Sequence, residues 1–267
     1  MKIFKKALCF DDVLLVPHES DVMSRKDISL NSNLCRGLRF RLPIISSPMD
    51  TVTESEMAIK MNWQGGLGII HRYNTIEEQS RLVRVAISES RSDGDEIVGG
   101  AIGVSGDYLE RASSLIKSGA RVICIDIAHG HHALMRHSLK VIRNTFGNDI
   151  HIMAGNVATL KATNDLADWG ADSVRVGIGG GSICSTRIQT GHGVPTFQSI
   201  IECSRTDRDV AIVADGGIRN SGDIVKALAA GADFVMLGSL LAGTDESPGD
   251  IIHSNGERCK QYRVMAS

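Results

Sequence analysis

The sequence predicts a single α/β domain folded as a (β/α)₈, or TIM, barrel, and three observations support this. Short β-branched runs alternate with longer helical stretches along the chain. The short runs are almost continuously apolar, which is typical of parallel strands buried on both faces. A length of 267 residues suits one such barrel. A doubly wound open sheet has the same alternation and is the alternative fold.

Eight strands and the helices between them follow from this alternation. The strands are expected at residues 43–49, 66–72, 97–104, 122–127, 151–157, 173–178, 210–218 and 234–239. Helices are expected at 53–62, 76–88, 108–118, 132–145, 160–169 and 221–230. Three helices end in Gly-Ala, which predicts a left-handed cap at Gly119, Gly170 and Gly231. The only linker-like stretch is 89–96, so we predict one domain over residues 1–267 with no inserted domain.

Composition restricts the partners and the compartment. A net charge of −2 gives no reason to expect a nucleic acid or an anionic membrane as partner. The apolar runs are too short to cross a bilayer. Six cysteines lie far apart with no Cys-x-x-Cys pair, which argues against structural zinc and against a secretory disulfide framework. We therefore expect reduced thiols and a cytoplasmic protein that binds small molecules.

The strand ends carry the unusual residues, and in such barrels function lies at the carboxyl ends of the strands. Residues 177–182 form a glycine-rich loop whose N–H groups suit a phosphate. Residues 215–217 and 238–239 end the next two strands, where phosphate sites of these barrels commonly form. The carboxylate of Asp215 is then placed to accept hydrogen bonds from ribose hydroxyls. At another strand end, Asp126 is a candidate for a cofactor or charge contact.

Cys184 follows the glycine-rich loop and is the candidate nucleophile. Nearby N–H groups and Arg187 are expected to favour its thiolate. Cys9, Cys35 and Cys124 carry no such signal and are interpreted as small apolar residues.

Several motifs, in order along the whole chain, resemble the IMP dehydrogenase/GMP reductase family. They are FDDVLL at 10–15, SSPMDTVTE at 46–54, GGLGIIH at 65–71, AGNV at 154–157, GIGGGSICSTR at 177–187, ADGGI at 214–218 and YRVMAS at 262–267. The resemblance implies a (β/α)₈ barrel, a homotetramer, and GMP or IMP as ligands.

The resemblance also implies a role for individual residues. Cys184 attacks C2 of the purine to give a thioimidate, and the hydroxyl of Thr186 assists the attacking or leaving nucleophile. The implied substrate-binding residues are Ser47, Met49, Asn156, Arg175, Gly181, Ser182, Asp215, Gly216, Gly217, Gly238, Ser239, Tyr262, Met265 and Ala266. The implied cofactor residues are Arg72, Asp126 and Ala128. A monovalent cation, K⁺, is implied at the backbone of Gly179, Gly181 and Cys184.

The chain departs from the family pattern in several places. Gly180 replaces a proline common in the loop, which gives the backbone more freedom, and Ser185 stands where Thr is common. Val264 and Ala266 stand where Gly is frequent. The mobile flap, the glutamate that contacts the base, and the last barrel helix are expected after Ser267. We therefore expect a barrel truncated before those parts, or another chain that supplies them.

Both activities of the family share the Cys184 adduct, and the sequence favours the reductase. A GMP reductase uses NADPH to convert GMP to IMP and ammonia, whereas an IMP dehydrogenase uses NAD to oxidise IMP to XMP. Absence of an inserted CBS domain and the Thr-Gly-x-Gly pattern at 190–193 are typical of reductases, and segment 71–73 resembles their cofactor side. Segments 46–50 and 215–223 instead resemble dehydrogenases. Two further hypotheses are a catalytically silent nucleotide-binding protein and an unrelated flavin-dependent barrel enzyme.

Overall fold

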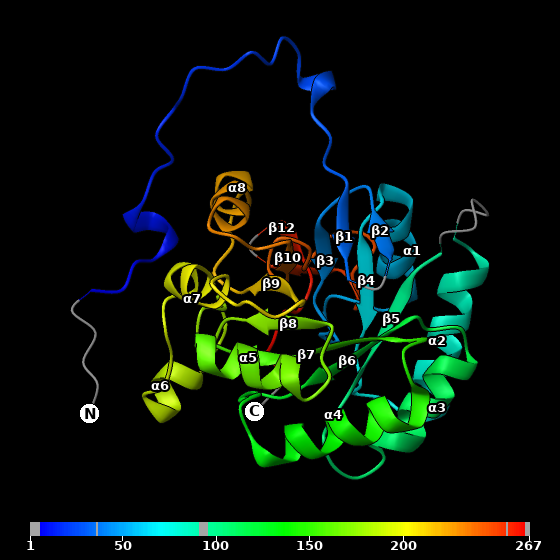
Figure 1. The fold of residues 1–267 in the computed structure, drawn as a ribbon. Helices are drawn as coiled ribbons and strands as arrows, with labels where there is room; N and C mark the ends of the chain where they lie inside the picture. The colour runs from blue at the N-terminus through cyan, green and yellow to red at the C-terminus, as the bar shows by residue number, and fades with distance from the viewer. Residues whose placement is uncertain (1–5, 36, 91–95, 255, 265–267) are drawn as a thin grey trace.

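Eight parallel strands form a closed barrel at the centre of the molecule (Figure 1). The computed structural model describes residues 6–35, 37–90, 96–254 and 256–264. Around the barrel the strands are β10 (Phe234–Leu237), β3 (Ile44–Ser46), β4 (Leu67–Ile70), β5 (Val98–Ile102), β6 (Val122–Asp126), β7 (His151–Val157), β8 (Ser173–Val176) and β9 (Ala211–Asp215). Pairing of β10 with β3 closes the sheet, which confirms the barrel and excludes the open sheet.

Most strands are shorter than the sequence predicts, by at most one residue at their amino ends and by up to three at their carboxyl ends. The first predicted strand, 43–49, ends as β3 at Ser46. The chain then turns, with the N–H of Met49 donating to the carbonyl of Ser47 at 2.8 Å. The buried Thr53 hydroxyl fixes this turn by donating to the same carbonyl at 2.6 Å. Residues that looked like strand by composition are therefore the loops that carry function.

The helices lie outside the barrel (Figure 1). They are α1 (Ser55–Gln64), α2 (Ile76–Ser88), α3 (Tyr108–Lys117), α4 (Ala133–Phe146), α5 (Leu160–Asp168), α6 (Thr186–Thr190), α7 (Thr196–Cys203) and α8 (Ser221–Ala229). Gly119, Gly170 and Gly231 have φ of 100°, 114° and 105°, as the left-handed caps predict. Helices α6 and α7 were not predicted. Helix α6 has five residues, and Pro195 at the start of α7 is the signal that could have located that helix.

Side chains inside the barrel alternate with those that face the helices. Along β6, Val122 and Cys124 point inward, whereas Ile123 and Ile125 pack in the helix-facing core. A hairpin of β1 (Ser32–Leu34) and β2 (Leu38–Phe40) covers the amino ends of the strands. Phe40 meets Phe234 edge to face with ring centroids 5.5 Å apart. The hairpin closes this end with apolar side chains above the buried pair of His151 and Ser173, and the inward charged residues lie at the opposite end.

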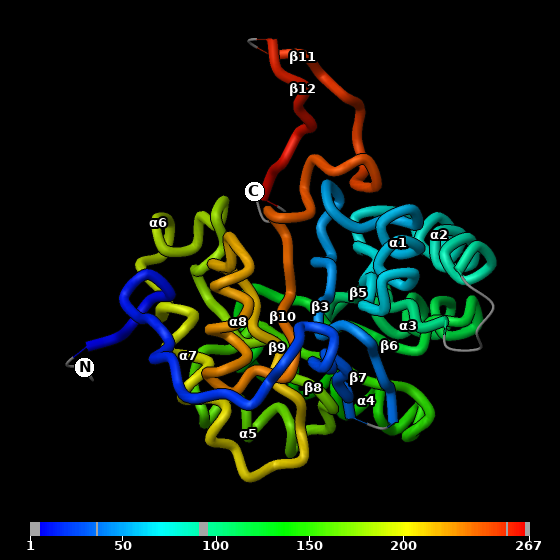
Figure 2. The backbone as a smooth tube through the Cα atoms, turned by 90° about the horizontal axis from the view of Figure 1, so that it is seen from above, coloured from blue at the N-terminus to red at the C-terminus, as the bar shows by residue number. Residues whose placement is uncertain are grey.

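Two further segments lie outside the barrel. A hairpin of β11 (Ile252–Ser254) and β12 (Glu257–Cys259) projects away from it (Figure 2). The amino-terminal segment, residues 6–31, holds short 3-10 helices at Phe10–Asp12 and Arg25–Asp27. Phe10 of this segment packs edge to face on Phe197 of α7, with ring centroids 5.6 Å apart. None of the helices in the described ranges has the length and apolar character needed to cross a membrane.

Candidate active site

Three charged side chains meet at the carboxyl ends of the strands. The inward alternation that contains Cys124 continues to Asp126, and the corresponding alternations on β8 and β9 bring Arg175 and Asp215 inward. The Arg175 guanidinium donates to Asp126 Oδ1 at 2.6 Å and to Asp215 Oδ2 at 2.8 Å. Only 6 % of the Arg175 side chain is exposed. One buried cation therefore joins two carboxylates from strands that lie on either side of it.

Asn156 joins this cluster from β7. The pairing of β7 with β8 is irregular between Gly155 and Val157, and such irregularities redirect side chains. The Asn156 amide donates to Asp215 Oδ2 at 2.7 Å and to the carbonyl of Gly177 at 2.8 Å. Gly155 leaves the room that Arg175 needs, because a Cβ there would lie 2.5 Å from the Arg175 Cβ. The cluster depends on a glycine that the sequence analysis did not select.

A cavity of about 280 Å³ opens above this cluster, and we call it the Cys184 cavity. It gathers most of the predicted residues: Ser47, Met49, Arg72, Asp126, Ala128, Asn156, Arg175, Gly179, Gly181, Cys184, Thr186, Asp215, Gly216 and Tyr262. Ile127, Ile183 and Val264 also line it and were not predicted as lining residues. The only feature of the sequence that could have indicated these three residues is that each is next or nearly next to a predicted residue.

Buried polar atoms in the Cys184 cavity indicate a polar ligand. Asn156 Oδ1, Arg175 Nε and Arg72 Nε are buried without a hydrogen-bond partner among the described residues. Buried polar groups are normally paired, and an unpaired one is costly. Asn156 Oδ1 and Arg175 Nε lie on the predicted substrate side, and Arg72 Nε lies on the predicted cofactor side. A polar ligand on each side would supply hydrogen-bond partners for them.

The thiol of Cys184 is partly exposed to this cavity and contacts Thr186. Its Sγ donates to Thr186 Oγ1 at 3.3 Å, and Thr186 is the first residue of α6. Burial raises the pKa of the Cys124 thiol to about 11, so that thiol is protonated and unreactive near neutral pH. Arg187, predicted to favour the Cys184 thiolate, lines a different cavity, which leaves the Thr186 hydroxyl as the side-chain partner of the thiol.

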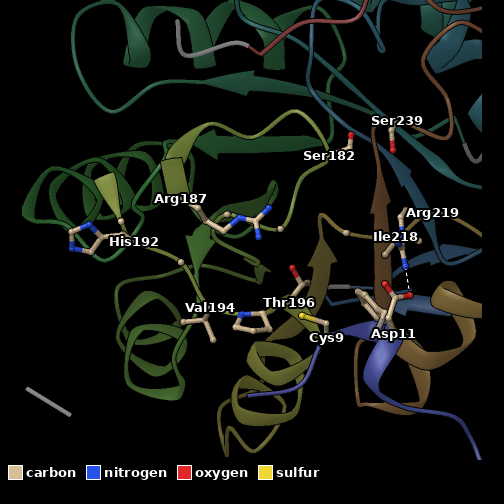
Figure 3. A pocket seen from close by; sticks show the side chains of 17 residues that line it. Cys9, Asp11, Ser182, Arg187, His192, Val194, Thr196, Ile218, Arg219 and Ser239 are labelled. Atoms are coloured by element: carbon tan, nitrogen blue, oxygen red, sulfur yellow. Dashed lines mark hydrogen bonds and ion pairs between the residues drawn. The ribbon is translucent and has the colours of Figure 1, made fainter. Parts of the chain in front are cut away.

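The predicted phosphate residues divide between two cavities. Tyr262 lines the Cys184 cavity, whereas Ser182, Gly217 and Ser239 line a second cavity of about 450 Å³, shown in Figure 3. We call the predicted phosphate residues Ser182, Gly217, Gly238, Ser239 and Tyr262 the phosphate cradle. A Cβ at Gly238 would lie 3.1 Å from the Tyr262 hydroxyl, so this glycine leaves room for that hydroxyl. Burial raises the pKa of Tyr262, which keeps its hydroxyl protonated and able to donate. The predicted base contacts Met265 and Ala266 lie outside the described residues.

The predicted cofactor side is built on His71, Arg72 and Tyr73. The buried His71 accepts the Tyr73 N–H at Nδ1 (3.1 Å), so its Nε2 carries the proton and donates to Glu54 at 3.1 Å. Arg72 lies over the Tyr73 ring, 5.1 Å from its centroid, and donates to the backbone carbonyl of Asp126 at 3.4 Å. These contacts hold an aromatic face and a cation at the edge of the Cys184 cavity, a surface that fits a nicotinamide dinucleotide.

The carbonyls predicted to hold a monovalent cation lie in the same loop. Gly181 accepts the N–H of Cys184 at 3.1 Å, whereas the carbonyls of Gly179 and Cys184 accept none from the described residues. A carbonyl oxygen has two lone pairs, so the turn leaves all three able to contact a cation.

Comparison with known proteins agrees with this geometry. Residues 7–267 match a family model described as "IMP dehydrogenase / GMP reductase domain". An inosine-5'-monophosphate dehydrogenase of Nitrosopumilus maritimus is 34 % identical, over 99 % of this chain and 81 % of the relative. One from Cryptosporidium parvum is 40 % identical, over 98 % and 74 %. A GMP reductase of Leishmania major is 32 % identical, over 98 % and 80 %.

These alignments also show long segments that this chain lacks. They run over 385 positions for the N. maritimus dehydrogenase and 392 for the L. major reductase, against the 267 residues of this chain. The alignment with the C. parvum dehydrogenase runs over only 302 positions. Dehydrogenases therefore occur both with long and with short additional segments, and a reductase occurs with long ones. Absence of an insertion does not indicate a reductase.

Proposed function

This chain belongs to the IMP dehydrogenase/GMP reductase family of purine-nucleotide oxidoreductases, and on that premise we propose that Cys184 bonds covalently to C2 of a bound nucleotide. The observation that carries this proposal is the partly exposed Cys184 thiol, which lies in the cavity with Asp126, Arg175 and Asp215. Asp215 would hold the ribose hydroxyls, and Asn156 and Arg175 would fix that carboxylate.

In the dehydrogenase direction, Cys184 Sγ forms a bond to C2 of IMP as a hydride leaves that carbon. A nicotinamide dinucleotide, which Arg72, Tyr73 and Asp126 would hold, supplies the hydride acceptor. Water then adds to C2, the C–S bond breaks, and XMP and the Cys184 thiolate are released. The Thr186 hydroxyl, 3.3 Å from Sγ, lies where it can relay the proton of the thiol or of the attacking water.

Two of the segments that line the Cys184 cavity, on the side where the substrate is predicted, favour this direction. Ser47 and Met49 belong to segment 46–50, and Asp215 and Gly216 to segment 215–223, the two that resemble dehydrogenases. Of the reductase-like segments, 71–73 lines the same cavity through Arg72 and Tyr73, whereas 190–193 contributes to the second cavity. We therefore place NAD-dependent dehydrogenation of IMP first, although the sequence alone favoured the reductase.

A GMP reductase is the second candidate. The Thr-Gly-x-Gly pattern at 190–193 and the relatives named GMP reductase in Leishmania favour it. In that direction Cys184 adds to C2 of GMP, ammonia leaves, and hydride from NADPH returns to C2 before the C–S bond breaks. The same residues serve both directions, because both pass through the adduct at Cys184.

Nicotinamide absorbance in two mixtures tests the direction. We expect NADH to form with IMP plus NAD, and no loss of NADPH with GMP plus NADPH. Consumption of NADPH with release of ammonia would instead make the protein a reductase. No change in either mixture, with nucleotide still bound, would favour a catalytically silent nucleotide-binding protein. The family match excludes the hypothesis of an unrelated flavin-dependent barrel enzyme.

The phosphate of the nucleotide is expected to supply much of its affinity. Ser182, Gly217, Ser239 and Tyr262 would contact it, and hydrogen bonds to a charged phosphate are stronger than neutral ones. We expect IMP to bind at least about a hundredfold more tightly than inosine, roughly 2.7 kcal/mol. Calorimetric titration of both ligands checks this, and Ser182→Ala should weaken IMP but not inosine. Equal affinity for IMP and inosine would contradict the proposal that these four residues bind the phosphate.

We also propose a homotetramer, K⁺ in the Cys184 loop, and one domain over residues 1–267. Large apolar side chains of the amino-terminal segment support an oligomer, since Leu14, Val16 and Met23 are 87 %, 72 % and 92 % exposed. The carbonyls of Gly179 and Cys184, which accept no hydrogen bond from the described residues, support the cation. The predicted linker is consistent with one domain, although its residues 91–95 lie outside the described ranges.

A further inference from the structure

The second cavity, of about 450 Å³, is larger than the Cys184 cavity and lies across the glycine loop from it. Gly179 and Gly180 line both cavities, so the wall between them is glycine backbone without side chains. Ser182, Gly217 and Ser239 line the second cavity (Figure 3). A monophosphate held by these residues would therefore have open space beyond it.

Arg187 places an unpaired cation in that space. Its guanidinium makes no hydrogen bond or ion pair with the residues that the structure describes, and Figure 3 shows it reaching from α6 into the cavity. A Cβ at Gly179 would lie 2.6 Å from Arg187 Cγ, and one at Gly193 would lie 3.0 Å from it. The absence of a side chain at these two glycines leaves room for the aliphatic part of the Arg187 side chain. The family pattern of a glycine-rich loop thus also positions a charge away from Cys184.

The other charged groups leave the cavity net positive. Arg219 forms an ion pair with Asp11, the only carboxylate among the described lining residues (Figure 3). Arg219 also lies 3.7 Å from Asp223, which Lys226 contacts at 3.9 Å. These two cations and the carboxylates of Asp11 and Asp223 balance, so the charge of Arg187 remains. His192, in the reductase-like pattern at 190–193, also lines the cavity. An anion is the ligand that this charge distribution favours.

Thr196 provides a second, independent sign of a ligand. Its side chain is 4 % exposed and lines the cavity, and its Oγ1 has no hydrogen-bond partner among the described residues. A Cβ at Gly180 would lie 2.1 Å from that oxygen, so Gly180, where the family often has proline, makes room for it. The amides of Gly179, Gly180 and Ser182 likewise donate to no described residue. A bound anion would accept from these donors and from the Thr196 hydroxyl.

We propose that the second cavity holds the outer phosphates of a purine nucleoside 5'-di- or triphosphate whose first phosphate lies in the phosphate cradle. This rests on the proposed function, because the nucleoside would occupy the Cys184 cavity. Polyphosphates would then compete with the monophosphate substrate, and Arg187 would select for them. Thr186, whose hydroxyl contacts the Cys184 thiol, precedes Arg187 in α6. A phosphate bound to Arg187 would therefore also hold Thr186 in place.

Titration of the Cys184→Ala protein with GMP, GDP and GTP, without divalent cations, tests the proposal. We expect GTP to bind at least about tenfold more tightly than GMP, roughly 1.4 kcal/mol. Arg187→Gln should remove that difference and change GMP affinity by less than about threefold. Arg208→Gln, an exposed arginine that pairs with Asp168 and Asp207, is the control and should leave both affinities unchanged.

Thr196→Val separates ligand binding from a structural role. It removes a buried hydroxyl without a partner, so the melting temperature should rise while GTP affinity falls. The proposal is overturned if GTP binds no more tightly than GMP, or if Arg187→Gln weakens both alike. If GMP itself does not bind, the proposed function fails. Titration with inorganic tripolyphosphate then tests whether the second cavity binds an anion. Binding that Arg187→Gln abolishes would support an anion site, and no binding would overturn it.

Discussion

Replacing Cys184 with alanine is expected to lower kcat by at least about a thousandfold, because the alanine cannot form the covalent adduct. Nucleotide affinity should stay within about tenfold, roughly 1.4 kcal/mol, since the predicted ribose and phosphate contacts do not involve the thiol. Thr186 would keep its place at the start of α6 but lose its contact with Sγ. Steady-state kinetics in the productive mixture and titration of IMP measure the two quantities separately.

Cys203→Ala is the matched control for this variant. Cys203 is fully buried in α7, and burial raises the pKa of its thiol to about 11. Its loss should cost about 1 kcal/mol of stability, from packing and from a weak contact with Thr163 outside the site, and leave kcat unchanged. Cys124 is less suitable, because its Sγ accepts from the Arg175 guanidinium at 3.5 Å. Substantial turnover by Cys184→Ala would mean that hydride transfer needs no thiol adduct.

Much of the fold could be predicted because its signals are local. Continuous apolar runs locate the eight strands, and β7 and α2 have the bounds that the sequence predicts. Glycines after helices predict left-handed caps, since a residue with a Cβ is strained there. Helix α6 was missed because five residues show no period. The predicted ends of β3 and β9 lie too late because Met49 and Ile218 are apolar residues of the loops that follow these strands.

The candidate site could be predicted only as a set of residues. Strand ends locate Asp126, Arg175 and Asp215, but only the register of β6, β8 and β9 shows that one guanidinium joins both carboxylates. The direction of Arg187 depends in the same way on Gly179 and Gly193, which belong to predicted motifs but whose closeness to the Arg187 side chain no motif shows. Pairwise geometry of this kind is set by tertiary packing and leaves little trace in one sequence.

Arg175 is the second residue whose replacement should have a large effect, because it holds the two halves of the site together. Its guanidinium contacts Asp126 on the predicted cofactor side and Asp215 on the predicted ribose side. The side chains of these aspartates are 22 % and 16 % exposed, so water screens them poorly. Burial opposes the charge of Arg175, but the two carboxylates outweigh it and raise its pKa, which keeps it a cation. Without that cation, two carboxylates would face each other in a poorly solvated site.

Arg175→Met is therefore expected to lower the free energy of unfolding by about 3–5 kcal/mol, the usual cost of breaking a buried ion pair. Urea denaturation measures this, and Arg208→Met, which breaks an exposed cluster, should not move the midpoint. Arg175→Lys should lie between, because an ammonium retains the charge but lacks the fork that reaches both aspartates. Adding Asp215→Asn to Arg175→Met removes one of the facing carboxylates, so the double variant should be more stable than Arg175→Met alone. If the second substitution destabilises the protein further, the cost comes from lost packing around Arg175, and repulsion between Asp126 and Asp215 is not its cause.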